Sequence, residues 1–367
     1  MKKLPPASQF QLQASEVCAQ LGISRDTLYA YVSRGLIRKI ADPLDARKSL
    51  YHADDLQKLI ARQKRPRARQ DVASSTINWG EPVLQSAITE IRDEQLFYRG
   101  HSAVKLSQTK SFEEVFELLA GISFTSRKAN KSDPVPSEIL RHKLPINRLM
   151  VFLAEEATQL GSLGGAQSVR RIMSRAGIIT AGLSQTNATK SIAETLAQTW
   201  CPDKKGSAQQ LNAALILCAD HELNASAYAA RVAASARANL GACLLSGIAT
   251  LSGDAHGGAT NLARDWEKKA ATLLDNKKAL SQFVTDNRPP GFGHPFYPNG
   301  DPRANELLRI ANADKKWRTL IRDVHRIHGV WPTLDFGLAV LEDALDLPKG
   351  SGLGIFALGR MAGWIAH

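Results

Sequence analysis

Apolar residues in the larger, C-terminal part of the chain form Ala- and Leu-rich runs, with few of the β-branched alternations that are typical of strands. This pattern predicts helices. Only Phe97–Gly100 is expected to form a short strand and turn, followed by two helices, the second starting at Ser111. Further helices are expected at roughly 139–161, 167–178, 190–199, 208–250, 261–268, 277–284, 315–324 and 335–344. We therefore expect an all-α body.

The first 61 residues show a different pattern. Ala14–Leu21 has its apolar residues on one face, Gly22 supplies a turn, and Ser24 is a typical N-cap for a second helix over Arg25–Arg34. Residues 36–50, rich in Lys and Arg, are typical of a wing, and another helix is expected over 52–61. This order of elements predicts a small winged helix-turn-helix domain over residues 1–62.

Tyr29, Tyr31 and Gly35-Leu36 lie in the second helix and at its exit. With these residues the stretch resembles the DNA-binding module of MerR-like and excisionase-like proteins. Recognition of DNA needs side chains on base edges. The candidates that face outward on the second helix are Arg25, Thr27, Tyr29 and Arg34. The alternative is an interaction module that kept this fold and lost DNA.

The net charge is +12, which predicts polyanionic partners such as nucleic acid or phosphorylated ligands. Five cations fall within Arg62–Arg69, inside a linker expected over 63–78. These cations would add phosphate contacts to any DNA sequence.

Four cysteines show no C-x-x-C spacing, so neither a metal site nor a disulfide framework is expected. The longest apolar run, near 240–251, is too short to span a bilayer. These features predict a soluble cytoplasmic protein with no membrane partner.

The most informative stretch is Pro289–Leu307. Gly291 and Gly293 permit a tight backbone path around His294, and Asp301-Pro302-Arg303 reads as a helix start with Asp as N-cap. An imidazole, free N–H groups and a guanidinium would together bind a small carboxylate. The alternative is a Pro/Gly surface loop with a solvated histidine.

Five other polar residues stand out against the apolar pattern. His221 and Asn224 fall in a stretch with apolar runs on both sides, and His256 is followed by two glycines. Asp335 opens a helix and could be only its N-cap. Arg360, the one charge in the final apolar helix, is expected to need a carboxylate partner from protein or ligand.

Several motifs occur in one order: AITEI, FYRG, SFEEV, ADHELNAS, GDAHGGA, GFGH with DPRA, PTLDF and IFALGRMAGWIAH. In these motifs, residues 79–367 resemble the citrate synthase family. The resemblance implies large and small helical domains, with the small one over about 257–334. It also implies a homodimer with active sites in the cleft between the two domains.

The resemblance also implies roles for single residues. Asp335 would remove a proton from the methyl group of an acyl-CoA, His256 would stabilise the enolate, and His294 would polarise the keto oxygen of a 2-oxo acid such as oxaloacetate. The carboxylates of that acid would be held by His221, Arg303 and Arg360, with Asn224 orienting them. Gly291, Phe292 and Gly293 would line the CoA chain. No cofactor is implied, because the CoA thioester is a substrate.

One departure from the family pattern stands out. Basic residues usually follow the loop histidine and help to hold CoA phosphates, whereas this chain has Pro295, Phe296 and Pro298. Two functions remain open. The first is an enzyme that condenses acetyl-CoA or propionyl-CoA with a 2-oxo acid. The second is a DNA-binding regulator whose body senses an acyl-CoA or a di- or tricarboxylate.

Overall fold

A computed structural model describes residues 10–33, 36–42, 45–53, 55–56, 86–124, 134–159, 164–185, 190–273, 275–313 and 315–367. The chain divides into two compact units, Met1–Trp79 and Gly80–His367. The basic linker expected over 63–78 and Arg34 lie outside the described residues. In the part of the chain that is described, no helix is long and apolar enough to cross a membrane.

In the described residues of the first unit, two short helices accompany a three-stranded antiparallel sheet. Its elements are β1 (Phe10–Gln13), α1 (Ala14–Leu21), α2 (Arg25–Ser33), β2 (Lys39–Asp42) and β3 (Asp45–His52), with strand order β1-β3-β2. Gly22, with φ 64°, ends α1, and the Ser24 hydroxyl accepts a hydrogen bond from Thr27 N at 3.3 Å. The predicted helix, turn and helix are therefore present. His52 was expected to start a helix but ends β3, where it pairs with Phe10.

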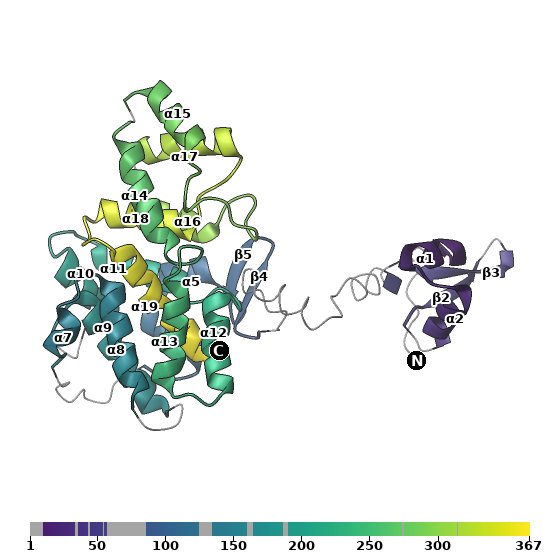
Figure 1. Ribbon diagram of the computed structural model, residues 1–367, viewed down its shortest axis with the longest axis horizontal. Coiled ribbons are helices and arrows are strands. Elements are labelled where there is room, and N and C mark those ends of the chain that lie inside the picture. Colours follow the sequence, from purple (N-terminus) through teal and green to yellow (C-terminus); the bar gives the residue numbers. More distant parts are fainter. Residues whose placement is uncertain are drawn as a thin grey trace. The chain divides into compact units, whose positions relative to one another are not determined.

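The second unit is mostly helical (Figure 1). Its described residues form α5 (Ala103–Thr109), α6 (Phe112–Ala120), α7 (Ser137–Leu140), α8 (Pro145–Ala157), α9 (Ala166–Ala181), α10 (Ile192–Trp200), α11 (Ser207–Cys218), α12 (Ala225–Ser235), α13 (Leu240–Leu251), α14 (Ala259–Ala271), α15 (Lys277–Asp286), α16 (Pro302–Ile310), α17 (Lys315–His328), α18 (Leu334–Ala344) and α19 (Ser351–Ala366). In Figure 1, α15 and α17 pack together at one end, and α14, α16 and α18 lie between them and the other helices.

Two of the predicted helices were too long. The expected helix over 139–161 is interrupted before Pro145, which starts α8 at its first turn. The expected helix over 208–250 is three helices, because Asn224 and Asn239 cap the starts of α12 and α13 with their side-chain oxygens. An apolar run without a clear period hides such breaks.

The expectation of an all-α body was also too simple. A second three-stranded sheet consists of β4 (Thr89–Arg92), β5 (Gln95–Tyr98) and β6 (His101–Ser102). Both connections are two-residue turns with positive φ at both positions, Asp93-Glu94 and Arg99-Gly100, which is the hairpin geometry that matches strand twist. Only part of β5 was predicted.

Helix α19 is the centre of the second unit, and every residue from Ser351 to Trp364 is buried. It packs most extensively against α11. A Cβ at Gly359 would lie 2.6 Å from the Leu215 carbonyl oxygen, and one at Gly363 would lie 2.4 Å from Asp220 Oδ1. These glycines therefore allow α11 to approach closely, which places the segment after α11 beside Arg360.

Candidate active site

Six polar side chains singled out in the sequence come together in the second unit from six different places in the chain. They are His221 after α11, His256 between α13 and α14, His294 before α16, Arg303 in α16, Asp335 in α18 and Arg360 in α19. Burial is the main cause of the pKa shifts of the three histidines and of Asp335, and the charge of Arg303 acts on all four. The six groups therefore form one site.

The loop that carries His294 is held against the start of α18. Gly291 and Gly293 have φ values of 76° and 79°, a backbone conformation that favours glycine. The Gly291 carbonyl accepts a hydrogen bond from Thr333 N at 2.8 Å, and Gly293 N donates to the Trp331 carbonyl at 2.8 Å. This short pairing places His294 next to the segment that leads into Asp335.

Tyr297 connects two of the three histidines. Its hydroxyl lies 2.9 Å from His221 Nε2, and the rings of His221 and His294 are 5.1 Å apart. Tyr297 is buried, and among the described residues His221 Nε2 is the hydrogen-bond partner of its hydroxyl. Because a buried hydroxyl needs an acceptor, we infer that Tyr297 donates and that neutral His221 carries its proton on Nδ1.

The tautomer of His294 is set by its own loop. Phe296 N donates to His294 Nδ1 at 3.2 Å, so the proton of the neutral ring lies on Nε2. Burial and the charge of Arg303 lower the pKa of His294 to about 4. Burial likewise lowers the pKa of His221 well below its ordinary value. Both rings are therefore neutral near pH 7 and present one N–H each.

His256 is held by Ser226, whose hydroxyl oxygen lies 2.9 Å from His256 Nε2 and accepts a hydrogen bond from Trp364 Nε1 at 3.2 Å. The Ser226 hydroxyl also donates to Asn224 Oδ1 at 2.8 Å. Asn224 Oδ1 accepts from two backbone N–H groups at 3.1 Å as well, so Ser226 links His256 to the start of α12. Burial lowers the pKa of His256 to about 3, with Arg360 and Arg303 adding to the effect.

Asp335 is a single carboxylate in the first turn of α18, where Thr333 is the N-cap. Thr260 donates to Asp335 Oδ1 at 2.7 Å and Thr333 donates to Oδ2 at 3.3 Å. Burial raises the pKa of Asp335, and these hydrogen bonds and the charge of Arg303 oppose the rise. A carboxylate with a raised pKa is a better proton acceptor than an exposed one.

The two buried arginines differ in their surroundings. Arg303 forms an ion pair with Asp301 at 2.8 Å, and although burial acts to lower its pKa, the Asp301 charge outweighs this and raises it. Arg360 donates from Nε to the Cys218 carbonyl at 2.7 Å, whereas its Nη1 has no hydrogen-bond partner among the described residues. The carboxylate partner expected for Arg360 is therefore not supplied by the described part of the protein.

The remaining predicted positions have structural contacts of their own. Asn224 caps α12 and also donates to the His221 carbonyl at 3.2 Å, so it positions the histidine's backbone. Phe292 is buried against Phe336, with ring centroids 4.6 Å apart. The described residues contain no group of three His, Cys, Asp or Glu side chains that could hold a metal ion.

The family model for the citrate synthase C-terminal domain matches residues 77–367. The chain belongs to the citrate synthase family. This is a family of acyltransferases whose acyl group becomes an alkyl group on transfer, the EC 2.3.3 class, and citrate synthases need no cofactor beyond the CoA substrate.

Individual members of the citrate synthase family agree with this placement. Citrate synthase 2 of Bacillus subtilis is 27% identical over 336 residues, covering 78% of this chain and 89% of its own. The structure of Thermotoga maritima citrate synthase matches with a TM-score of 0.62 at 23% identity, over 80% of this chain and 90% of its own. A ternary complex of Thermoplasma acidophilum citrate synthase with carboxymethyl-CoA and oxaloacetate matches with a TM-score of 0.65 at 21% identity, over 80% of this chain and 91% of its own. These similarities to solved structures show the fold.

Four residues of this site were missed in the sequence. Tyr297, Ser226, Thr260 and Thr333 hydrogen-bond the predicted histidines and Asp335 from positions up to 76 residues away in the chain. Ser226 lies inside the ADHELNAS motif, so its proximity to His221 could be predicted from the sequence. Its hydrogen bond to His256 could not, because that bond depends on how α13 packs against α12.

In the first unit, Arg25 and Tyr29 are exposed on α2, Tyr29 by 52%. Thr27 is half-buried, and its hydroxyl lies 3.0 Å from that of Ser24 at the helix cap.

Proposed function

We propose that Gly80–His367 catalyses a Claisen condensation of acetyl-CoA or propionyl-CoA with oxaloacetate or a related 2-oxo acid, releasing CoA. The observation that carries this proposal is the set of three imidazoles of lowered pKa, each with one ring nitrogen hydrogen-bonded to the protein and the other without a protein partner among the described residues. They surround one carboxylate of raised pKa and two buried guanidinium groups.

In the proposed reaction the Asp335 carboxylate takes a proton from the methyl group of the acyl-CoA. The electron pair left on carbon delocalises to the thioester oxygen, which accepts a hydrogen bond from His256. The enolate carbon then attacks the keto carbon of the oxo acid, whose oxygen accepts a hydrogen bond from His294 Nε2 and, as an alkoxide, takes up one proton. Asp335 releases the methyl proton before the next turnover. Water finally cleaves the thioester, giving the acid and the CoA thiol. Neutral donors suit this chemistry because they stabilise an oxyanion without giving up a proton beforehand.

The oxo-acid carboxylates are assigned to His221, Arg303 and Arg360. Arg303 also lies over the Tyr297 ring, 5.3 Å from its centroid, and this holds it beside His221 and His294. We place Gly291, Phe292 and Gly293 along the CoA chain. Their backbone N–H and carbonyl groups that do not pair with residues 331–333 would face the substrate.

We further propose a homodimer and a small subdomain. The surface of Ala-rich α12 carries Val232, which is 49% exposed, and α12 packs against α13, so this pair supplies an apolar face for a second copy. The small subdomain is placed over about 257–334, which contains α14 to α17.

The proposed reaction is tested with purified protein by the release of thiol. Acetyl-CoA plus oxaloacetate is expected to release one thiol per molecule condensed, and either substrate alone is expected to release none. Propionyl-CoA in place of acetyl-CoA measures the acyl preference. Absence of thiol release with every pair of acyl-CoA and 2-oxo acid would rule out this proposal.

The first unit supports a second candidate function, DNA binding, which would make the chain a regulator whose body senses an acyl-CoA or carboxylate ligand. The observation in its favour is the helix, turn and helix with Arg25 and Tyr29 exposed on α2. Two basic side chains of this unit are paired with carboxylates, which reduces the positive charge available for DNA. Arg38 lies 2.7 Å from Asp55, and Lys48 lies 3.4 Å from Asp45.

If the candidate is right, the full chain binds duplex DNA with an affinity that falls steeply as salt rises, because cations displace counterions. The double variant Arg25→Gln/Tyr29→Ala is expected to bind DNA more weakly than the wild-type chain, as measured by fluorescence anisotropy. Arg141→Gln, an exposed change in the second unit, serves as the control. Equal binding by all three proteins would assign DNA contact to other residues.

A further inference from the structure

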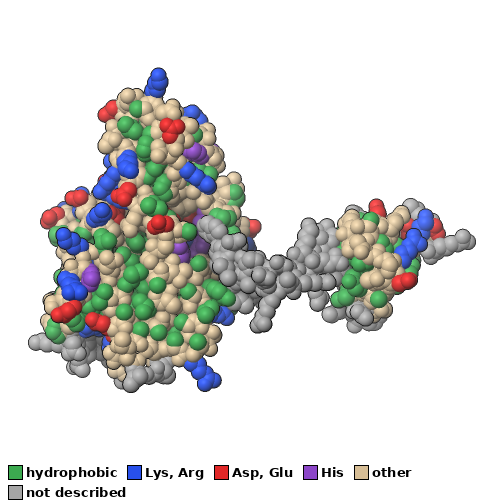
Figure 2. Space-filling view, viewed as in Figure 1, with side chains coloured by type: hydrophobic (Ala, Val, Ile, Leu, Met, Phe, Trp, Pro, Cys, Tyr) green, Lys and Arg blue, Asp and Glu red, His purple; other side chains and the backbone are tan. Residues whose placement is uncertain are grey.

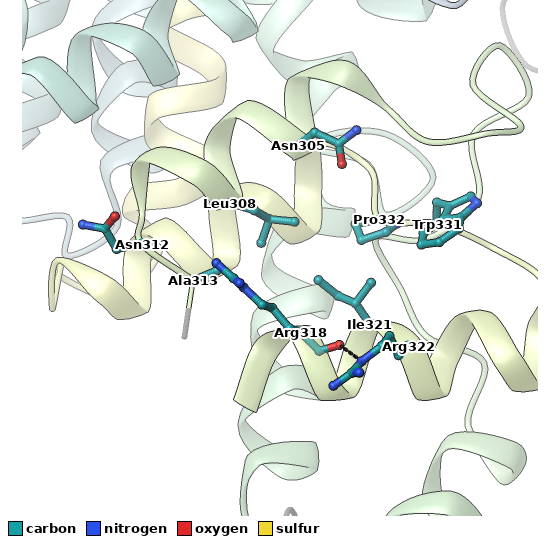
Figure 3. A pocket seen from close by; sticks show the side chains of 9 residues that line it. All are labelled: Asn305, Leu308, Asn312, Ala313, Arg318, Ile321, Arg322, Trp331 and Pro332. Carbon is teal, nitrogen blue, oxygen red and sulfur yellow. Dashed lines mark hydrogen bonds between the residues drawn. The ribbon is translucent and has the colours of Figure 1, made fainter. Parts of the chain in front are cut away.

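A cleft of about 800 Å³ lies between α16 and α17, outside the site described above. Figure 3 shows α16 on one side, α17 on the other and Trp331 with Pro332 at one end. Its lining combines apolar, amide and cationic side chains, among them Asn305, Leu308, Arg318, Ile321, Arg322 and Trp331. This volume and mixture suit an organic ligand that carries negative charge.

Two cations line this cleft. Arg318 and Arg322 lie one turn apart on α17, an arrangement in which like charges repel. Neither has a carboxylate partner in the described part of the chain; Arg322 instead donates to the Arg318 carbonyl at 3.2 Å. The other arginines of α14 to α17 each have a carboxylate partner: Arg264 with Glu267, Arg303 with Asp301, Arg309 with Glu306 and Arg326 with Asp323.

The surroundings of the cleft add to its positive charge. Lys and Arg side chains are spread over the surface of α14, α15 and α17 (Figure 2). Helix α17 itself contains four Lys or Arg residues besides Arg326 and only one carboxylate, Asp323. A bound anion would relieve this repulsion, and arginine forks are well matched to phosphate.

The cleft and the catalytic loop share one segment of chain. The Trp331 carbonyl accepts from Gly293 N, next to His294, and Pro332 pairs with Phe292. Asp335 follows Trp331 by four residues, a distance of at most about 14 Å along an extended chain. The cleft thus begins within about 14 Å of the Asp335 backbone, a span that an extended ligand can cover.

A CoA thioester has this form, because its reactive acyl group and its phosphates lie at opposite ends. The loop from Pro295 to Pro302 has no Lys or Arg for those phosphates, and Arg303 is paired with Asp301. We propose that the cleft binds the phosphorylated adenosine end of the CoA substrate, with Arg318 and Arg322 on the phosphates and Trp331 beside the base. This inference rests on the proposed condensation for the identity of the ligand.

Isothermal calorimetry with adenosine 3′,5′-bisphosphate tests the site without any turnover. The wild-type chain is expected to bind, and the double variant Arg318→Gln/Arg322→Gln is expected to bind at least about 30-fold more weakly, since two charge-assisted phosphate contacts are lost. Arg326→Gln is the matched control, because Arg326 lies on the same helix but is paired with Asp323 and does not line the cleft. It is expected to bind like wild type.

Steady-state kinetics then test whether the nucleotide bound in the cleft is that of the CoA substrate or a free nucleotide. The double variant is expected to raise KM for acetyl-CoA by a similar factor with little change in kcat, and to leave turnover of an acetyl thioester that lacks the nucleotide unchanged. No binding of the bisphosphate by wild type, equal binding by the double variant, or equal loss in Arg326→Gln would overturn the site. An unchanged KM for acetyl-CoA together with tight binding of ATP would overturn the CoA assignment. Absence of thiol release with intact bisphosphate binding would count against the condensation and not against the cleft.

Discussion

Asp335→Asn is expected to lower kcat for thiol release by about 10²- to 10⁴-fold, the usual contribution of a positioned general base. Asparagine keeps the shape of the side chain and can still accept the hydrogen bond from Thr260, so the local structure is preserved. KM for oxaloacetate is expected to stay within a few-fold, since Asp335 is assigned to the methyl proton and not to the carboxylates. Steady-state kinetics with both substrates varied measure the two effects.

A matched control lies at the end of the same helix. Asp346→Asn changes an exposed carboxylate with φ 53°, a conformation that asparagine tolerates well, and is expected to leave kcat unchanged. If Asp335→Asn retained more than about a tenth of the wild-type rate, another group would have to be the base.

The pH dependence gives an independent check on Asp335. Burial raises its pKa above the ordinary 3.8, so the acid limb of the kcat profile is expected above that pH. The folded protein holds this proton more tightly than the unfolded chain does, and ionisation therefore costs stability at neutral pH. Asp335→Asn is expected to raise the free energy of unfolding at pH 7, with the gain vanishing as pH falls through the raised pKa to below 3.8.

The features that were predictable from the sequence are those that depend on residues close together in the chain. Asp301 caps α16 and α6 begins beside Ser111, as expected, because caps and Pro depend on neighbours three or four residues away. Ser111 also forms a capping box with Glu114. The glycines around His294 have the positive φ values that a tight path requires. These local rules placed the histidines, Asp335 and Arg303 on loops and helix starts.

The features that were not predictable depend on residues distant in the chain. The Tyr297 contact with His221 joins positions 76 apart, and the Thr260 contact with Asp335 joins positions 75 apart. A hydroxyl in an unremarkable sequence position gives no indication of the histidine that it will meet. Thr89–Arg92 was missed as a strand because four residues carry little periodicity, and its partner β5 and the Asp93-Glu94 turn decide its structure.

Arg360 differs from Arg148, a buried arginine outside the site, in how well its guanidinium is hydrogen-bonded. Arg148 donates to four carbonyl oxygens, those of His142, Lys143, Ile179 and Thr180, at 2.8–3.2 Å. Four of its five N–H groups thus have acceptors in the protein. Arg360 is more deeply buried, at 1% exposed, yet among the described residues its guanidinium has one hydrogen-bond acceptor, the Cys218 carbonyl, and Nη1 has none.

Burial lowers the pKa of Arg360, and the charge of Asp220 offsets this only in part. Keeping a poorly bonded cation in the core costs free energy, so it is expected to have a function that a satisfied arginine lacks. We therefore expect Arg360→Lys, which keeps the charge near Asp220 but loses the planar fork, to raise KM for oxaloacetate roughly 30- to 150-fold, equivalent to about 2–3 kcal/mol. KM for acetyl-CoA is expected to change little.

Arg148→Lys is the matched control, and it should show the opposite behaviour. Lysine cannot reach four carbonyls, so the free energy of unfolding in urea is expected to fall by about 2 kcal/mol or more while KM for oxaloacetate stays near wild type. Arg360→Lys, by contrast, is expected to unfold within about 1 kcal/mol of wild type, because only one hydrogen bond is at risk. A loss of stability in Arg360→Lys as large as in Arg148→Lys, with an unchanged KM for oxaloacetate, would make Arg360 a structural residue and leave the oxo-acid carboxylate to Arg303 and His221.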